Sequence, residues 1–447
     1  MKIIYNARLV MAGAVSTGYV LIDGEKIQEV AAGCPDGHLL DVCDDCVDAA
    51  GAWLLPGVID THVHLREPGL THKATIASES RAAVAGGVTS FIDMPNVVPP
   101  TVTLDALADK WARAEQGSLA NYSFYVGATA TNVDMLVHEV DYSLVPGVKV
   151  FLGSSTGGML VDDAQVLRRI FGQVPALIAV HSEDETMIRQ GLEQARARYG
   201  DDVPVQCHPL IRSRQACYRS TLRAVELARQ LGTRLHVLHV TTARELELFA
   251  SGDLADKRIT AEACVGHLWF CDSDYDRLGT RIKVNPAIKT AADRDALRRA
   301  VASGVIDVVS TDHAPHTLSE KCQKYLKSPS GMPLAQFSLV TMLELSRQGW
   351  FSIEQVIDKM CHAPARLFGI ANRGYVRAGY QADLVMVRDV PQGYRLADED
   401  VRSLCGWTPL AGAEMHHRVV CTWVNGVEVY PHEPERSPAQ ALHYDRV

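Results

Sequence analysis

Residues 54–64 read Leu-Leu-Pro-Gly-Val-Ile-Asp-Thr-His-Val-His, an apolar run that ends in two histidines. The apolar part, Leu54–Ile59, has the length and composition of a buried β-strand, and His62 and His64 follow at its carboxyl end. Residues two apart on a strand point to the same face, so both imidazoles can reach one metal ion. An isolated His-x-His pair is more often two ordinary polar residues. Its meaning therefore depends on the ends of the other strands.

Apolar strand-like runs alternate with amphipathic helical stretches along most of the chain. Helical stretches such as Arg214–Leu231 and Arg294–Ala302 lie between the runs. This alternation predicts an α/β fold with a parallel sheet built from repeated βα units. Eight units favour a closed barrel, although the number alone also permits an open, doubly wound sheet. The eight runs are Leu54–Ile59, Val88–Met94, Tyr122–Val126, Val148–Leu152, Ala176–Val180, Arg234–Leu238, Ile259–Ala261 and Ile306–Val309.

Both ends of the chain have the pattern of short antiparallel strands. Ile3–Val10 is followed by strand-like runs on either side of Asp23-Gly24, and near the other end Asn425-Gly426 gives a strong signal for a hairpin. We expect the two ends to build one β domain together.

Three further runs carry a polar residue at their carboxyl ends. His181 follows the fifth run, His239 the sixth and Asp312 the eighth. In a barrel these ends converge on one face, so the side chains would meet His62 and His64 in a single site. Imidazole and carboxylate ligands suit zinc, and manganese, iron or cobalt can occupy such a site as well.

Lys149 lies inside the fourth apolar run, where a charged ammonium group costs considerable desolvation free energy. One interpretation is that an uncharged Lys149 adds carbon dioxide and becomes a carbamate, whose two oxygens can bridge two cations. The other is that Lys149 points outward and forms a salt bridge with a helix.

Composition and charge exclude several classes of function. Hydrophobic residues make up 47% of the chain and charged residues 22%, as in an ordinary folded protein. The formal charge is 44 − 53 = −9, and the basic residues form no stripe, so we expect no nucleic acid partner. Met1–Met11 lacks the features of a secretion signal and no later segment could span a bilayer. We therefore expect a cytoplasmic protein without a membrane partner.

Several motifs are specific when taken together. They are Pro56–Gly69 (PGVIDTHVHLREPG), Asp93–Asn96 (DMPN), Lys283–Pro286 (KVNP), Thr311–His316 (TDHAPH), Ala363–Gly369 (APARLFG) and Ala382–Leu384 (ADL). On these motifs the chain resembles the cyclic amidohydrolases of the amidohydrolase superfamily, and within them the long-chain dihydroorotases. The resemblance covers nearly the whole chain.

The resemblance implies a distorted (β/α)₈ TIM barrel over residues 56–375. It also implies a small β-sandwich built from residues 1–55 and 376–447, the second part including the C-terminal tail. Two Zn²⁺ ions are implied, bridged by a carboxylated Lys149, although some long-chain relatives hold one metal or lack the modified lysine. By the same resemblance one metal is held by His62, His64 and Asp312, and the other by His181 and His239.

For activity, the resemblance implies reversible hydrolysis of dihydroorotate to N-carbamoyl-aspartate in pyrimidine (UMP) synthesis, with Asp312 moving the proton. Arg66 would grip the substrate carboxylate in bidentate fashion, and the alternative role for Arg66 is a salt bridge with Glu67 or a helix. Further substrate contacts are implied for Asn96, Asn285 and His316, of which the last two fit turn roles equally well.

Other readings of the sequence stay open. A related cyclic amidase, such as a dihydropyrimidinase, hydantoinase or allantoinase, would use the same metals, and an inactive scaffold is the alternative from another class. Val265-Gly266-His267 and Cys217 depart from the usual family pattern, at positions that are not metal ligands. Residues 317–333 read either as a mobile lid or as an ordinary surface loop.

Among partners, we expect a small-molecule substrate, a homo-oligomer and a possible association with aspartate carbamoyltransferase.

Overall fold

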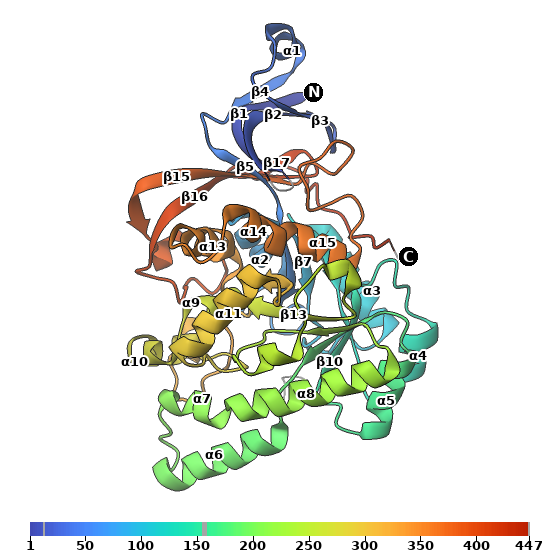
Figure 1. Ribbon diagram of the computed structural model, residues 1–447, viewed down its shortest axis with the longest axis vertical. Helices are drawn as coiled ribbons and strands as arrows, with labels where there is room; N and C mark the ends of the chain where they lie inside the picture. The colour runs from blue at the N-terminus through green and yellow to red at the C-terminus, as the bar shows by residue number, and fades with distance from the viewer. Residues whose placement is uncertain (12–13, 154–158, 446–447) are drawn as a thin grey trace.

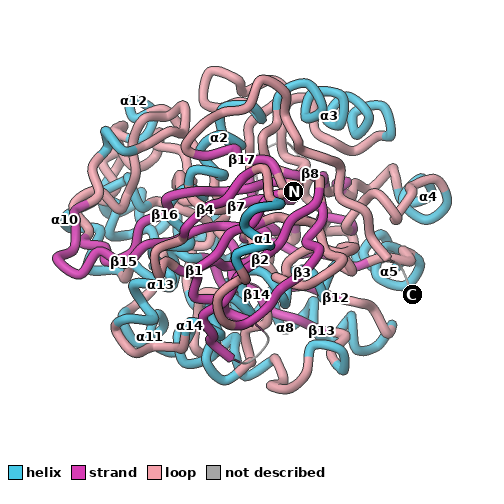
Figure 2. Tube along the Cα trace, turned by 90° about the horizontal axis from the view of Figure 1, so that it is seen from above, coloured by secondary structure: helices cyan, strands magenta, loops and turns pink. Residues whose placement is uncertain are grey.

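The structure, a computed structural model, describes residues 1–11, 14–153 and 159–445. A sheet formed by both ends of the chain lies at one end of the molecule, and the helices α6 and α8 lie at the other (Figure 1). Seen from above in Figure 2, strands occupy much of the centre and most helices lie around the rim. Within the described ranges, none of the helices combines the length and the apolar character needed to cross a bilayer.

The terminal sheet joins strands that are far apart in sequence. Its order is β17-β16-β15-β5-β1-β2-β3, with β4 paired to β1, so β5 meets β15 and links the two ends. The predicted hairpin at Asn425-Gly426 joins β16 to β17, and both of its turn residues have the positive φ that favours this pair. The strands are β1 (Lys2–Met11), β2 (Ala14–Asp23), β3 (Lys26–Ala32), β4 (Asp45–Asp48), β5 (Trp53–Pro56), β15 (Leu384–Arg395), β16 (Glu414–Val424) and β17 (Val427–Tyr430).

The barrel consists of two parallel sheets that join at both sides. One sheet has the order β14-β13-β12-β11-β10-β9 and the other β6-β7-β8, and only Tyr125 separates β8 from β9. On the other side Val63 bridges His313, and the His64 amide donates to the His313 carbonyl at 2.7 Å. The predicted barrel is confirmed, and an open sheet is excluded. Its strands are β6 (Val58–Val63), β7 (Val88–Asp93), β8 (Asn121–Phe124), β9 (Val126–Gly127), β10 (Gly147–Phe151), β11 (Leu177–His181), β12 (Leu235–Val237), β13 (Ile259–Cys264) and β14 (Val308–Ser310).

The first predicted run, Leu54–Ile59, was wrong as a single strand. Its first half belongs to β5 of the terminal sheet, and its second half begins β6 of the barrel. The chain changes sheets at Gly57, where a Cβ atom would lie 2.1 Å from Thr89 Oγ1. Because the residues on both sides of Gly57 are buried and apolar, hydropathy does not mark this boundary.

Helices cover the barrel. The predicted helix Arg214–Leu231 is α8, which Ser213 caps at its amino end and which stops at Gly232 in a left-handed conformation. The helices are α1 (Gly37–Val42), α2 (Ile76–Ala85), α3 (Leu104–Gly117), α4 (Val133–His138), α5 (Ala164–Gln173), α6 (Glu185–Tyr199), α7 (His208–Ile211), α8 (Arg214–Leu231), α9 (Val265–Trp269), α10 (Tyr275–Leu278), α11 (Ala291–Ser303), α12 (Leu318–Lys321), α13 (Ser338–Arg347), α14 (Ile353–Ile357) and α15 (Ala363–Phe368).

Candidate active site

A cavity of about 160 Å³ at the carboxyl ends of the barrel strands gathers every residue that the sequence predicted for the site. The strands β6, β10 and β11 supply some of these residues, and the segments after β7, β12 and β14 supply others. The predicted residues that line the cavity are His62, His64, Arg66, Asn96, Lys149, His181, His239, Asn285, Asp312 and His316.

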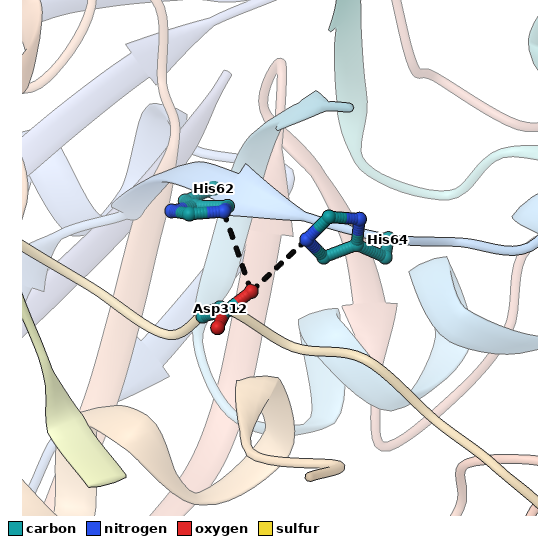
Figure 3. A group of neighbouring side chains, drawn as sticks. All are labelled: His62, His64 and Asp312. Carbon is teal, nitrogen blue, oxygen red and sulfur yellow. Dashed lines mark hydrogen bonds and ion pairs between the residues drawn. The ribbon is translucent and has the colours of Figure 1, made fainter. Parts of the chain in front are cut away.

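Two histidines and one carboxylate form the first group of possible metal ligands. His62 and His64 project from the end of β6, and Asp312 faces them from the segment after β14 (Figure 3). Oδ1 of Asp312 lies 3.3 Å from Nε2 of His62 and 3.0 Å from Nε2 of His64. One ligand atom from each residue lies within 4.8 Å of the others, which is close enough for all three to reach one ion.

His181 and His239 form a second group beside the first. His181 ends β11, and His239 follows β12 by two residues. Nδ1 of His181 and Nε2 of His239 lie 2.9 Å apart, with both rings buried. The two nitrogens therefore face a common point, as two ligands of one ion do.

Lys149 points into this cavity from β10 and is 1% exposed. Its Nζ lies 4.7 Å from the centre of the Phe151 ring. No carboxylate among the described residues lies within 4.0 Å of it, so the alternative of an outward salt bridge was wrong. Burial lowers the pKa of Lys149 to about 7, which leaves much of the amine uncharged at neutral pH.

The protonation states of this donor set suit a divalent cation. Burial lowers the pKa of His64 to about 4, and it lowers those of His181 and His239 as well, so these imidazoles are neutral and carry a lone pair. Burial alone would raise the pKa of the Asp312 carboxyl, but His62 and His64 outweigh it and hold that pKa at about 2. Neutral imidazoles with a carboxylate are a zinc-type ligand set, so the residues fit the implied metals.

Three of the ligand histidines contact a second side chain that fixes the ring. Nδ1 of His64 donates to the Asn96 amide oxygen at 2.7 Å, so Asn96, which the sequence predicted only as a substrate contact, orients a candidate metal ligand. Glu183 lies 3.1 Å from Nε2 of His181 and is itself paired with Arg212. Glu262 lies 2.8 Å from Nδ1 of His62. Such partners set the ring orientation and tautomer of metal-binding histidines.

Sequence reasoning missed Glu183 and Glu262. Both side chains are 0% exposed. A signal for Glu262 was present, because it is a charged residue inside the apolar strand β13, as Lys149 is inside β10. Glu183 gave a weaker signal, two residues beyond a predicted ligand.

Arg66 is buried at the edge of the cavity. Its Nε donates to the Pro315 carbonyl at 2.9 Å, and Nη2 lies 2.9 Å from Nε2 of His316. The alternative salt bridge with Glu67 was wrong, because Glu67 pairs with Arg113 and accepts from the Ile76 amide. In the part of the chain that the structure describes, no carboxylate lies within 4.0 Å of the Arg66 guanidinium.

His316 and Asn285 lie beside Arg66. Nζ of Lys73 lies 3.0 Å from Nδ1 of His316. Burial and the nearby charge of Arg66 lower the pKa of the His316 imidazole. The side-chain oxygen of Asn285 is buried, and within the described ranges it has no hydrogen-bond partner. Both residues thus contribute polar side chains to the cavity wall.

The segment after Asp312, read from sequence as a lid or a surface loop, is a packed wall of the cavity. Lys321, at the end of α12, is buried and donates to the carbonyls of Lys283 and Pro329, each at 2.9 Å. Lys283 donates in turn to the carbonyls of Tyr325 and Ser328. Residues 329–331 line the cavity directly. These buried contacts favour a fixed wall over a mobile lid.

Three site residues have strained backbones. Arg66, His239 and Asp312 have φ values of 67°, 40° and 51°, in the left-handed region that side chains rarely adopt. Strain of this kind persists where the surrounding structure holds it, and it is concentrated at functional sites.

Comparison with known proteins agrees with this geometry. The chain matches the Amidohydrolase family over residues 53–166 and 177–429. It is 36% identical to a dihydroorotase of Halobacterium salinarum, over 88% of this chain and 89% of that protein. It is 28% identical to an allantoinase of Bacillus velezensis, over 96% and 93%. The solved structure of an L-hydantoinase from Arthrobacter aurescens has a TM-score of 0.91 and 27% identity, covering 99% of each chain. The chain belongs to the amidohydrolase family and is a hydrolase of cyclic amides.

Proposed function

We propose that this chain is a dihydroorotase, which opens the ring of dihydroorotate to N-carbamoyl-aspartate and closes it again for pyrimidine synthesis. The observation that carries the choice of substrate is Arg66. A buried guanidinium that has no carboxylate of the described residues within 4.0 Å, beside a set of metal ligands, is suited to a substrate that brings its own carboxylate. The relatives named dihydroorotase support this choice.

The metal centre is part of the proposal. His62, His64 and Asp312 would hold one Zn²⁺, His181 and His239 the other, and a carboxylated Lys149 would bridge the two. When bound, such ions lower the pKa of water and polarise an amide carbonyl.

Asp312 would move the proton in both directions. In ring opening its carboxylate accepts a proton from the attacking water and delivers it to the ring nitrogen as the amide C–N bond breaks. In ring closure it takes a proton from the ureido nitrogen as that nitrogen bonds to the carboxyl carbon, and it passes the proton to the departing hydroxyl, which leaves as water. Its contacts with His62 and His64 hold the carboxylate beside the reacting atoms in either direction.

The substrate carboxylate would lie against Arg66, with Asn96, Asn285 and His316 completing its surroundings. Nε of Arg66 donates to Pro315, and this bond fixes the plane of the guanidinium. A fixed plane suits two parallel hydrogen bonds to a carboxylate.

An amidase for uncharged rings is the second candidate, and it is favoured by the similarity to an L-hydantoinase over the whole chain. Such a substrate would leave the Arg66 charge buried and unpaired, which is costly. An inactive scaffold has less support, because every predicted ligand position carries a side chain that can bind a metal, and all of these side chains line one cavity.

A direct assay tests the proposal. Purified chain reconstituted with zinc should interconvert dihydroorotate and N-carbamoyl-aspartate, and should turn over hydantoin, dihydrouracil and allantoin far more slowly. Equal or faster turnover of the uncharged rings would refute dihydroorotate as the substrate. The expectations of a homo-oligomer, of an association with aspartate carbamoyltransferase and of a cytoplasmic location stay predictions.

A further inference from the structure

Glu262 stands on β13, between β12 and β14, and it is fully buried beneath the cavity. It does not line the cavity, so substrate does not reach it. Its two carboxylate oxygens nevertheless contact segments that carry both groups of ligands.

The first contact is with a side chain. Oε1 of Glu262 lies 2.8 Å from Nδ1 of His62, and Nδ1–H donates to this carboxylate, which leaves Nε2 on the side of Asp312. Thr61, the residue before His62, donates from its hydroxyl to Oε2 at 3.4 Å. Glu262 therefore fixes the ring of a ligand in the first group.

The second contact is with the backbone of the other group. The amide of His239 donates to the same Oε1 at 3.2 Å. The next amide, that of Val240, donates to the Glu262 main-chain carbonyl at 2.8 Å. His239 has a φ of 40°, a conformation that must be held by its surroundings. Of these two bonds, the one from the His239 amide depends on the Glu262 side chain, and the one from Val240 is made by the main chain.

The other ring partners act on one ligand each. Asn96 contacts His64, and Glu183 contacts His181. Among the contacts of the described residues, those of Glu262 reach a ligand of each group, and those of Asn96 and Glu183 to the ligands reach one.

We propose that Glu262 is a positioning residue that sets the geometry of both metal sites, through the ring of His62 and through the backbone of His239. This inference rests on the proposed metal centre. It predicts that a change at Glu262 weakens the binding of both ions, whereas a change at Glu183 weakens the binding of one.

The test measures zinc bound per chain against free zinc set by a chelator. Glu262→Gln should raise the free zinc needed for half-occupancy of both ions by about tenfold or more. Glu183→Gln should shift one ion. Glu245→Gln is the matched control, because Glu245 is a buried glutamate that accepts hydrogen bonds from Thr221 and Thr242 and, in the described part of the chain, contacts none of the proposed metal ligands. It should shift neither ion.

A second measurement, the rise in melting temperature on adding zinc, separates zinc binding from the stability of the variant. Zinc should raise the melting temperature of Glu262→Gln less than that of the unchanged chain, whatever the starting stability of the variant. If Glu262→Gln is not recovered folded, Glu262→Asp, which draws the carboxylate back from His62, should show the same loss.

Three results would overturn the inference. Unchanged zinc affinity in Glu262→Gln would do so, as would a shift of one ion only. The third is an equal loss in Cys264→Ser. Cys264 lies 3.6 Å from the same oxygen, and with His62 and Glu262 it could itself face a cation. An unchanged chain that binds no zinc would instead refute the proposed metal centre.

Discussion

Oδ1 of Asp312 lies 3.0 Å from Nε2 of His64, a contact that joins the segment after β14 to the end of β6. The contact has an electrostatic consequence, because the imidazoles of His64 and His62 hold the pKa of the buried Asp312 carboxyl at about 2. Asp312 is therefore a carboxylate throughout the physiological pH range, ready to bind a cation and to accept a proton.

Asp312→Asn should lower kcat for ring opening and ring closure by about 100-fold or more, because an amide cannot accept the proton. The rate measured on both substrates at saturating concentration checks this. Asp307→Asn is a suitable control, since Asp307 is a buried aspartate that pairs with Lys257 outside the cavity. It should cost stability and leave kcat near that of the unchanged chain. Equal kcat losses in the two variants would argue against a proton role for Asp312.

Arg66→Ala should lower kcat/KM for dihydroorotate by about 30-fold or more, equivalent to about 2 kcal/mol, while zinc content stays the same. Arg66→Lys keeps the charge but loses the two parallel hydrogen bonds, so its kcat/KM should lie between that of the unchanged chain and that of Arg66→Ala. Glu67→Gln is the control, because Glu67 is next to Arg66 in the sequence but pairs with Arg113. It should leave kcat/KM near that of the unchanged chain. Loss of zinc together with activity in Arg66→Ala would mean that the role of Arg66 is structural.

Lys149 should carry the carbamate. After incubation with ¹³C-bicarbonate and zinc, a carbamate carbon signal should appear by NMR and be lost in Lys149→Met, which should also bind less zinc. Lys110→Met should keep the signal, because Lys110 is equally buried but its ammonium group is paired with Asp93. A signal that survives in Lys149→Met would place the carbamate elsewhere.

The metal-free chain should lose stability as the pH falls. Burial lowers the pKa of His267 and of His362 to about 4 from an ordinary value of 6.5, so between these values the unfolded chain binds protons that the folded chain does not. The stability from both groups is present above about pH 6.5 and is lost toward pH 4. Melting temperatures across this range check the sign, and His362→Gln, outside the cavity, should flatten the dependence. A melting temperature that rises on acidification would contradict it.

Much of the barrel was predictable because the βα pattern repeats. Helix α8 was predicted to the residue, since Ser213 and Gly232 mark both of its ends. The break at Gly57 was not predictable from hydropathy, because the chain stays buried while it passes from one sheet to the other. That break depends on the close approach of Thr89, a tertiary contact.

The candidate site was predicted where a polar residue follows an apolar strand. That rule found His62, His64, His181, His239 and Asp312, which the structure gathers into one cavity. It missed Glu183 and Glu262, whose effect depends on contacts across the barrel rather than on their place in the sequence.

The metal-to-protein ratio of the purified chain after reconstitution with zinc tests the central claim most directly. We predict about two zinc ions per chain, a ratio near one in His181→Ala, and a clear loss in His62→Ala as well. A ratio near zero, or one that neither substitution changes, would contradict a metal centre built from these side chains.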